Sequence, residues 1–231
     1  MDWFQAVDIY CERTSTALWA EPVNAASNAA FILAALWAAF EARKRGLTQP
    51  ILWLLITMAA LIGAGSFLFH THANRWSGLA DTLPIWSFVG VFVLTAMHYI
   101  GGMPVARVLR VAGLVAAAVV LTIWLLASGE GADTGAQAAD PLNGSGQYAP
   151  AVLALLVFSF VSWRRRSPSA PWIWAATATF LVSLTFRTFD MAVCPSMPLG
   201  THFVWHLLNG LMIGLLLQML IRNLAALKPA R

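Results

Sequence analysis

Charged residues are scarce in this chain of 231 amino acids, and lysine and cysteine each occur only twice. Asp, Glu, Lys and Arg together make up 10% of the sequence, whereas soluble domains average about 25%. Hydrophobic residues make up 59%, and a soluble domain of this size could not bury so much apolar surface. The aromatic content of 12% excludes a disordered chain. We therefore expect an integral membrane protein.

Seven hydrophobic stretches are long enough, with a few flanking residues, to cross a bilayer as helices of about 20 residues. We predict an all-α integral membrane protein that folds as a seven-transmembrane-helix bundle, with a single domain over residues 1–231. Residues 1–22 are expected to form an outer interfacial segment that lacks the features of a cleaved signal peptide. Residues 128–147 are expected to form a flexible outer loop. The seven stretches are Val23–Phe40, Leu52–Phe69, Pro84–Tyr99, Val111–Leu126, Ala149–Trp163, Trp172–Thr185 and Phe203–Ile221.

The basic residues predict the orientation, because Lys and Arg of short loops stay in the cytoplasm. Eleven of the 14 basic residues fall at four helix ends that share one side only if the N-terminus lies outside and the C-terminus in the cytoplasm. Such short clusters suit anionic lipid headgroups, so the sequence predicts the bilayer as a partner and implies neither nucleic acid nor a partner protein. The clusters are residues 43–45, Arg107 with Arg110, residues 164–166, and Arg222 with Lys228 and Arg231.

Ionisable side chains at the predicted outer ends of four helices mark a candidate site, since such groups are costly within a membrane. His202 and His206 are four residues apart, as are Ser66 and His70, so each pair shares one helical face. Three imidazoles at one depth match a catalytic zinc site, which leaves the fourth position to water. The alternative is that these histidines only form polar contacts between helices.

Other polar residues complete this picture. Asp81 could accept the proton of the water, and the Ser66 hydroxyl could hydrogen-bond the oxyanion formed at an attacked carbonyl. Arg187 and Asp190 are three residues apart and are expected to neutralise each other, the alternative being a role in binding the substrate. His72, two residues from His70, is expected at the interface, and His98 falls near the opposite end of its helix, away from the site.

Five short motifs occur in order along the chain: Cys11-Glu12, Ala20–Asn24 with Ser27-Asn28, Gly63–His70, Asp81–Pro84 and His202–His206. With these motifs the chain resembles the alkaline ceramidase family, within a superfamily of seven-helix membrane hydrolases that includes adiponectin-receptor-like proteins. The resemblance implies a multi-pass membrane hydrolase that cleaves the amide bond of ceramide to sphingosine and a fatty acid, with its active site toward the non-cytoplasmic face. It implies that His70, His202 and His206 bind zinc beside Ser66 and Asp81.

The resemblance also implies a calcium site in the N-terminal segment, formed here by Asp8, Glu12 and Glu21. Their spacing differs from the family pattern, and the alternative is a solvated acidic interface. Cys11 and Cys194 both lie on the predicted outer side, where they are either two buried thiols or a disulfide. The resemblance implies the disulfide.

Two further classes of function stay open at this stage. One is a seven-helix lipid receptor or sensor in which zinc is structural, although structural zinc sites normally have four protein ligands and only three histidines are evident. The other is a hydrolase of another lipid amide or of a lipid ester. A retinal-binding pump is excluded because the two lysines, Lys44 and Lys228, both fall at predicted cytoplasmic ends.

Overall fold

The computed structural model describes residues 2–128 and 140–227, and nearly all of the regular structure there is helical. A single pair of residues, Ala6 and Asn74, forms an isolated β-bridge. The helices are α1 (Pro22–Ser27), α2 (Ala29–Lys44), α3 (Pro50–His72), α4 (Arg75–Tyr99), α5 (Val105–Ser128), the 3-10 helix η1 (Ser145–Tyr148), α6 (Ala149–Arg164), α7 (Ala170–Val193) and α8 (His202–Ala226).

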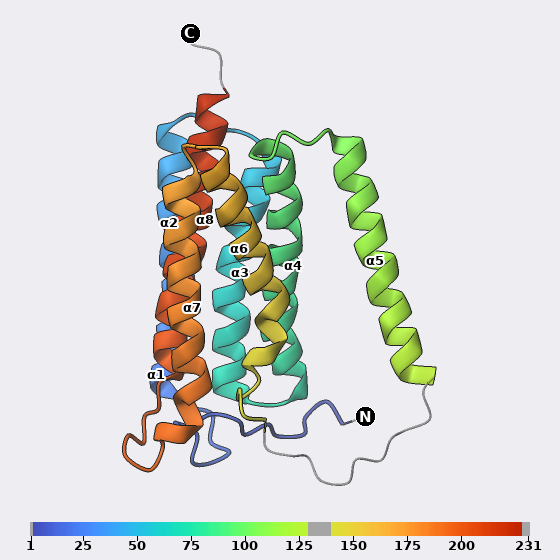
Figure 1. Cartoon of the computed structure of the whole chain (residues 1–231). Helices are drawn as coiled ribbons and strands as arrows, with labels where there is room; N and C mark the ends of the chain where they lie inside the picture. The colour runs from blue at the N-terminus through green and yellow to red at the C-terminus, as the bar shows by residue number, and fades with distance from the viewer. Residues whose placement is uncertain (1, 129–139, 228–231) are drawn as a thin grey trace.

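The helices run up and down a bundle, with α1 and α2 forming one rod that is interrupted at Asn28 (Figure 1). Helices α2, α3, α4, α6, α7 and α8 pack together, whereas α5 stands apart beside α4 (Figure 1). The N-terminal segment crosses one end of the bundle, and α8 ends at the other (Figure 1). Counting α1 and α2 as one rod, the chain passes along the bundle seven times.

Six of these helices are long and apolar enough to cross a membrane, which fits a multi-pass membrane protein. The exception among the predicted spans is α7, which has sufficient length at 24 residues but carries Arg187 and Asp190 near its end. Both polar residues are buried inside the bundle. The prediction of seven spans is therefore confirmed for six helices by length and composition.

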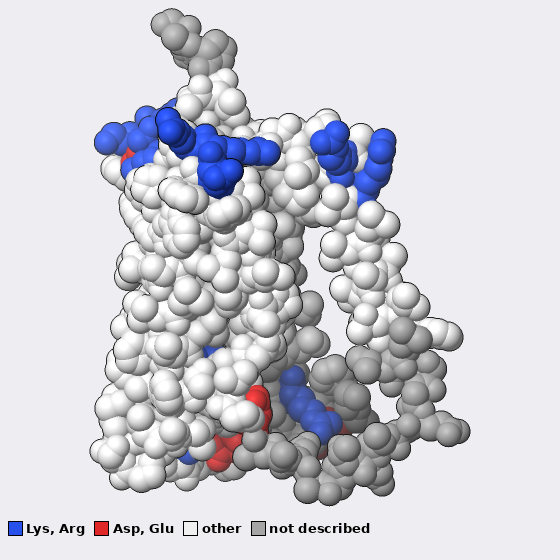
Figure 2. Space-filling model, in the orientation of Figure 1, with Lys and Arg blue, Asp and Glu red and all other residues white. Residues whose placement is uncertain are grey.

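Charge is distributed unevenly between the two ends of the bundle. Lys and Arg side chains gather at the end where α2 and α6 finish and α5 begins, and acidic side chains appear near the opposite end (Figure 2). Arg43 and Lys44 lie in the last turn of α2, and Arg164 closes α6. Lys228 and Arg231 lie outside the described residues. Which end faces the cytoplasm stays a prediction.

Helix α4 begins nine residues before the predicted stretch, which started at Pro84. Asn74 caps the helix, because its side chain accepts the backbone N–H of Ser77 while the Ser77 hydroxyl accepts the N–H of Asn74. Pro84 therefore lies inside α4, and Asp81 lies in its second turn rather than at its first residues. The hydrophobic stretch did not reveal this start, because the first turns of α4 contain polar residues such as Arg75 and Ser77.

The N-terminal segment is fixed to the end of the bundle at two places. The backbone N–H of Val7 donates a hydrogen bond to the turn between α3 and α4, and the N–H groups of Arg75 and Trp76 donate hydrogen bonds back to the N-terminal segment. Cys11 and Cys194 form a disulfide that joins the segment to the end of α7. Of the predicted loop 128–147, residues 129–139 lie outside the described part, and residues 145–147 belong to η1.

Candidate metal centre

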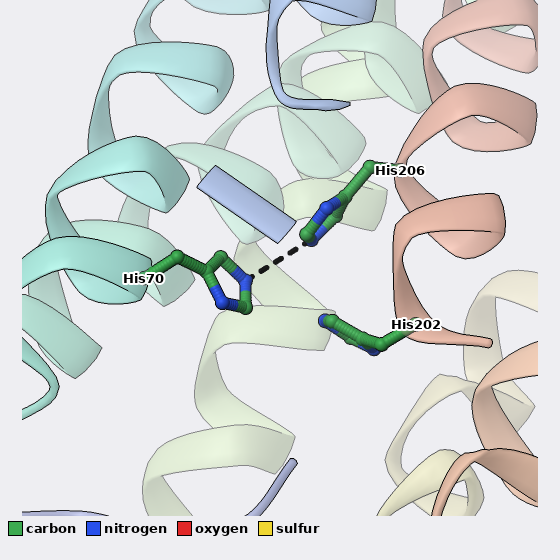
Figure 3. Close-up of side chains that lie close together, drawn as sticks. All are labelled: His70, His202 and His206. Carbon is green, nitrogen blue, oxygen red and sulfur yellow. Dashed lines mark hydrogen bonds between the residues drawn. The ribbon is translucent and has the colours of Figure 1, made fainter. Parts of the chain in front are cut away.

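Three histidines converge at the end of the bundle that carries the N-terminal segment. His70 lies in the last turn of α3, and His202 and His206 lie one turn apart at the start of α8 (Figure 3). Their possible ligand nitrogens all lie within 4.8 Å of one another, and all three residues are buried. Among the His, Cys, Asp and Glu residues within 2–128 and 140–227, these three form the group that could hold a metal ion.

The carboxylate of Glu21 lies behind His70, on the far side from the other two rings. Its Oε2 is 2.6 Å from Nδ1 of His70, and the carboxylate also accepts hydrogen bonds from Arg13 and from the side-chain amide of Asn24. Burial alone would raise the pKa of the Glu21 carboxyl, but these hydrogen bonds outweigh burial and hold the pKa below its ordinary value. The ionised carboxylate therefore accepts the Nδ1 proton of His70, an arrangement common behind metal-binding histidines.

Ser27 plays the corresponding part for His206. The Ser27 hydroxyl donates to the carbonyl of Asn24 at 2.8 Å, so its oxygen is left to accept from Nδ1 of His206 at 2.7 Å. A neutral imidazole carries one N–H, and this network assigns that proton to Nδ1 in both His70 and His206. The Nε2 lone pairs of the two rings then face each other.

The separation of those lone pairs fits a metal ion. The Nε2 atoms of His70 and His206 are 3.2 Å apart, the contact drawn as a dashed line in Figure 3. Two nitrogen ligands at tetrahedral angles and the usual zinc distance would be about 3.3 Å apart. With both ring protons on Nδ1, a cation held by these nitrogens would relieve the repulsion of the lone pairs. The donor set of three imidazoles fits zinc with an open position.

His202 is fixed by Asp190 and by Tyr10. Asp190 Oδ1 accepts the backbone N–H groups of Thr201 at 2.7 Å and His202 at 2.9 Å, which anchors the start of α8. Gly200 permits this turn, because its φ is +66° and a Cβ there would lie 2.2 Å from the same carboxylate oxygen. The Tyr10 ring stacks on the His202 ring with centroids 3.7 Å apart. Nδ1 of His202 is buried and finds no hydrogen-bond partner among the described residues.

An apolar cavity opens beside His202 and His206, and Ser66 and Asp81 also line it. Gly65 brings these two residues together, because a Cβ on Gly65 would lie 2.1 Å from the Ala80 carbonyl oxygen and would push α3 and α4 apart. Along α4 the cavity wall runs from Asp81 to Ala96, which corresponds to about 22 Å of helix. The cavity therefore has a polar end at the histidines and an apolar part that follows α4.

A sequence model of the family described as Ceramidase matches residues 8–228, which is nearly the whole chain. The chain belongs to the ceramidase family. Comparison with curated proteins finds no match. Membership of this family implies a hydrolase that acts on a lipid, and the resemblance identified in the sequence is confirmed at the level of the family.

The structure corrects the predicted pairing of Arg187 with Asp190. Asp190 accepts three backbone N–H groups, those of Thr201 and His202 and that of Cys11 at 3.0 Å. Arg187 instead donates from Nη1 to the Tyr10 hydroxyl at 3.1 Å. The expectation that the two residues neutralise each other is therefore wrong, because the turn before α8 supplies better donors to the carboxylate.

The acidic residues predicted to bind calcium are not gathered into one group. Asp8 is exposed, and both oxygens of Glu12 accept backbone N–H groups at the start of α1, from Val23 and Asn24, at 2.8 Å each. Glu21 instead contacts His70, and the buried guanidinium of Arg13 lies against it. This arrangement does not fit a calcium site made of these three acids.

Four residues that support the three histidines were not recognised from the sequence in those roles. Glu21, Ser27, Tyr10 and Asp190 each contact one of the three histidines or its backbone. Glu21 and Ser27 belong to a quoted family motif and lie six residues apart, but nothing local indicates which histidine each meets. The remaining histidines lie outside this cluster, since His98 bonds the Met103 carbonyl and His72 is exposed beside Trp76.

Proposed function

We propose that this protein is a zinc-dependent amidohydrolase that cleaves the amide bond of ceramide or a closely related lipid amide. The observation that carries the proposal is the convergence of the three imidazoles at the polar end of an apolar cavity. Two of these rings, His70 and His206, direct their Nδ1 protons to Glu21 and Ser27. Membership of the ceramidase family supports the lipid amide as substrate.

Asp81 and Ser66, which line the cavity, have complementary roles in this proposal. Zinc held by the three histidines would supply a Lewis acid that polarises the amide carbonyl and makes water more acidic. The Asp81 carboxylate accepts a proton from the attacking water and returns it to the departing amine. The Ser66 hydroxyl donates a hydrogen bond to the oxygen that becomes negative. The acyl chain lies along α4, where the cavity wall is apolar.

We further propose that α7 is a seventh transmembrane span and that the basic end of the bundle faces the cytoplasm, with the metal centre near the outer face. Arg187 and Asp190 can lie in a span because both side chains are buried in the bundle. A cysteine introduced at Ser167, between α6 and α7, should react with a membrane-impermeant maleimide only from the cytoplasmic side. Labelling from outside would contradict this orientation.

The test of the activity combines substrate, metal and variants. Purified protein in detergent should release sphingosine from ceramide, and a zinc chelator should abolish the release. His206→Ala should lose zinc and activity together, whereas Asp81→Asn should keep zinc, measured by elemental analysis, and lose turnover. His98→Ala is the matched control, because His98 bonds the Met103 carbonyl outside the centre.

The assay also separates the alternatives. Release of fatty acid from a phospholipid ester, with none from ceramide, would indicate an esterase that uses the same centre. Full activity of both His206→Ala and Asp81→Asn would contradict the proposed roles. Zinc binding without hydrolysis of any lipid would favour a receptor, although a centre with three protein ligands retains the open position that an enzyme needs.

A further inference from the structure

Arg187 is a buried cation in the wall of the same cavity as the metal centre. Its side chain lines the cavity together with Ser66, Asp81 and His202, and the residue is only 6% exposed. The rings of Tyr10, Tyr148 and Trp205 surround the guanidinium, with centroids 5.8, 5.6 and 5.5 Å from Cζ. Cation–π attraction from three rings offsets part of the cost of burying the charge.

The guanidinium has no carboxylate partner in the described part of the chain. Asp190, one turn further along α7, is occupied by three backbone N–H groups. No described Asp or Glu lies within salt-bridge distance of Arg187, and its Nε has no hydrogen-bond partner among those residues. Buried charges are normally paired because desolvation is costly. The cavity therefore holds a charge that an anion would neutralise.

Tyr10 adds a second donor at the same place. Its oxygen accepts from Arg187, so the hydroxyl proton remains available to another acceptor. Tyr10 also stacks on His202, so this pair of donors adjoins the metal centre.

We propose that Arg187 binds a carboxylate on the amine half of the substrate, so that the preferred substrates are long-chain N-acyl amino acids rather than neutral ceramides. The inference rests on the proposed amidohydrolase activity. The acyl half occupies the apolar cavity along α4, and the amine half then lies at the polar end with Arg187. In the reaction, the oxygen of water joins the acyl carbon, the C–N bond breaks, and a proton goes to the amine nitrogen, giving a fatty acid and a free amino acid.

A different role for Arg187 would be to favour the charged form of Asp81, which lines the same cavity. In that case, replacing Arg187 would slow all amide substrates by the same factor. A carboxylate-binding role instead changes the ratio between a charged and a neutral substrate. The ratio is therefore the measurement that separates the two roles.

The test uses N-palmitoyl-serine and N-palmitoyl-serinol, which differ only in a carboxylate against a hydroxymethyl group, with ceramide as a third substrate. The wild-type protein should cleave the serine amide with a kcat/KM at least tenfold above that of the serinol amide. Arg187→Gln should bring this ratio close to one. Arg187→Lys, which keeps the charge, should retain a preference of a few fold, and it serves if the glutamine variant fails to fold.

Arg222→Gln is the matched control, because Arg222 pairs with Gln218 near the end of α8, away from the centre. It should leave the ratio unchanged. A wild-type ratio near one, or a ratio that Arg187→Gln does not lower, would overturn the proposal.

Thermal unfolding with each amide gives a readout that does not depend on turnover. The serine amide should raise the unfolding temperature of the wild type and not that of Arg187→Gln, while the serinol amide should shift both alike. If no amide were cleaved but this shift appeared, the proposed hydrolase would fail and carboxylate binding would stand. If no amide were cleaved and the serine amide did not raise the unfolding temperature, both the proposed hydrolase and the carboxylate binding would be overturned.

Discussion

The hydrogen bond from His70 to Glu21 offers a direct test of how the metal centre is held. Glu21→Gln keeps the size of the side chain and removes its charge. Three groups lose an ionised acceptor, namely His70, Arg13 and Asn24. Removal of such an outer partner typically weakens metal binding by about 10- to 100-fold, which is about 1.4 to 2.7 kcal/mol.

The same substitution should also destabilise the metal-free protein. Arg13 is 7% exposed, and without Glu21 its guanidinium becomes a buried charge without a carboxylate, a loss that typically costs about 3–5 kcal/mol. A second substitution, Arg13→Met, removes that unpaired charge, so the double variant should be more stable than Glu21→Gln alone. Zinc affinity should stay low in both, because neither restores the acceptor for His70.

The assay is competition for zinc with a chromophoric chelator in detergent, together with thermal unfolding of the metal-free and zinc-bound protein. Glu41→Gln is the control, since Glu41 pairs with Arg45 at the other end of the bundle and should affect neither quantity. Zinc binding by Glu21→Gln as tight as that of the wild type would refute the part assigned to this carboxylate.

Three other perturbations have defined outcomes. Gly65→Ala places a Cβ against the Ala80 carbonyl and should cost about 1–3 kcal/mol in thermal unfolding with a fall in kcat, whereas Gly90→Ala, which has open space, should be tolerated and serves as its control. Reduction of the Cys11–Cys194 disulfide should lower stability by about 2–5 kcal/mol and weaken zinc binding; an unchanged melting temperature would contradict this. A calcium-selective chelator should change neither melting temperature nor activity, because an arginine already contacts the buried acid of the N-terminal segment. A calcium-dependent gain in stability would show that the acidic residues rearrange around the ion.

The three histidines could be predicted from the sequence because their signal is local. His202 and His206 share a helical face by spacing alone, and His70 reaches the same depth because helix lengths are set by the membrane. Helix α4 was predicted less well, since its first turns contain polar residues and the true start depends on the cap at Asn74. The boundary was decided by a side chain outside the hydrophobic stretch.

Contacts between distant segments could not be predicted in the same way. Asp190 is three residues from Arg187, yet its partners come from the turn before α8 and from Cys11, which is 179 residues away in sequence. Glu21 was predicted to bind calcium because it is acidic and because the family resemblance implies a calcium site there. Its position beside His70 depends instead on how the N-terminal segment folds over the bundle. These roles follow from tertiary packing, for which a single sequence has no periodic signal.

The disulfide also sets the order in which the protein matures. Cys11 and Cys194 are 183 residues apart, so the bond can form only after most of the chain has been synthesised. Until then the segment that carries Tyr10, Arg13 and Glu21 is tied to the bundle covalently only through the peptide chain that continues into α1. The contacts from this segment that support the three histidines are consequently secured as a late step of biogenesis, after helices α3 and α8 have met.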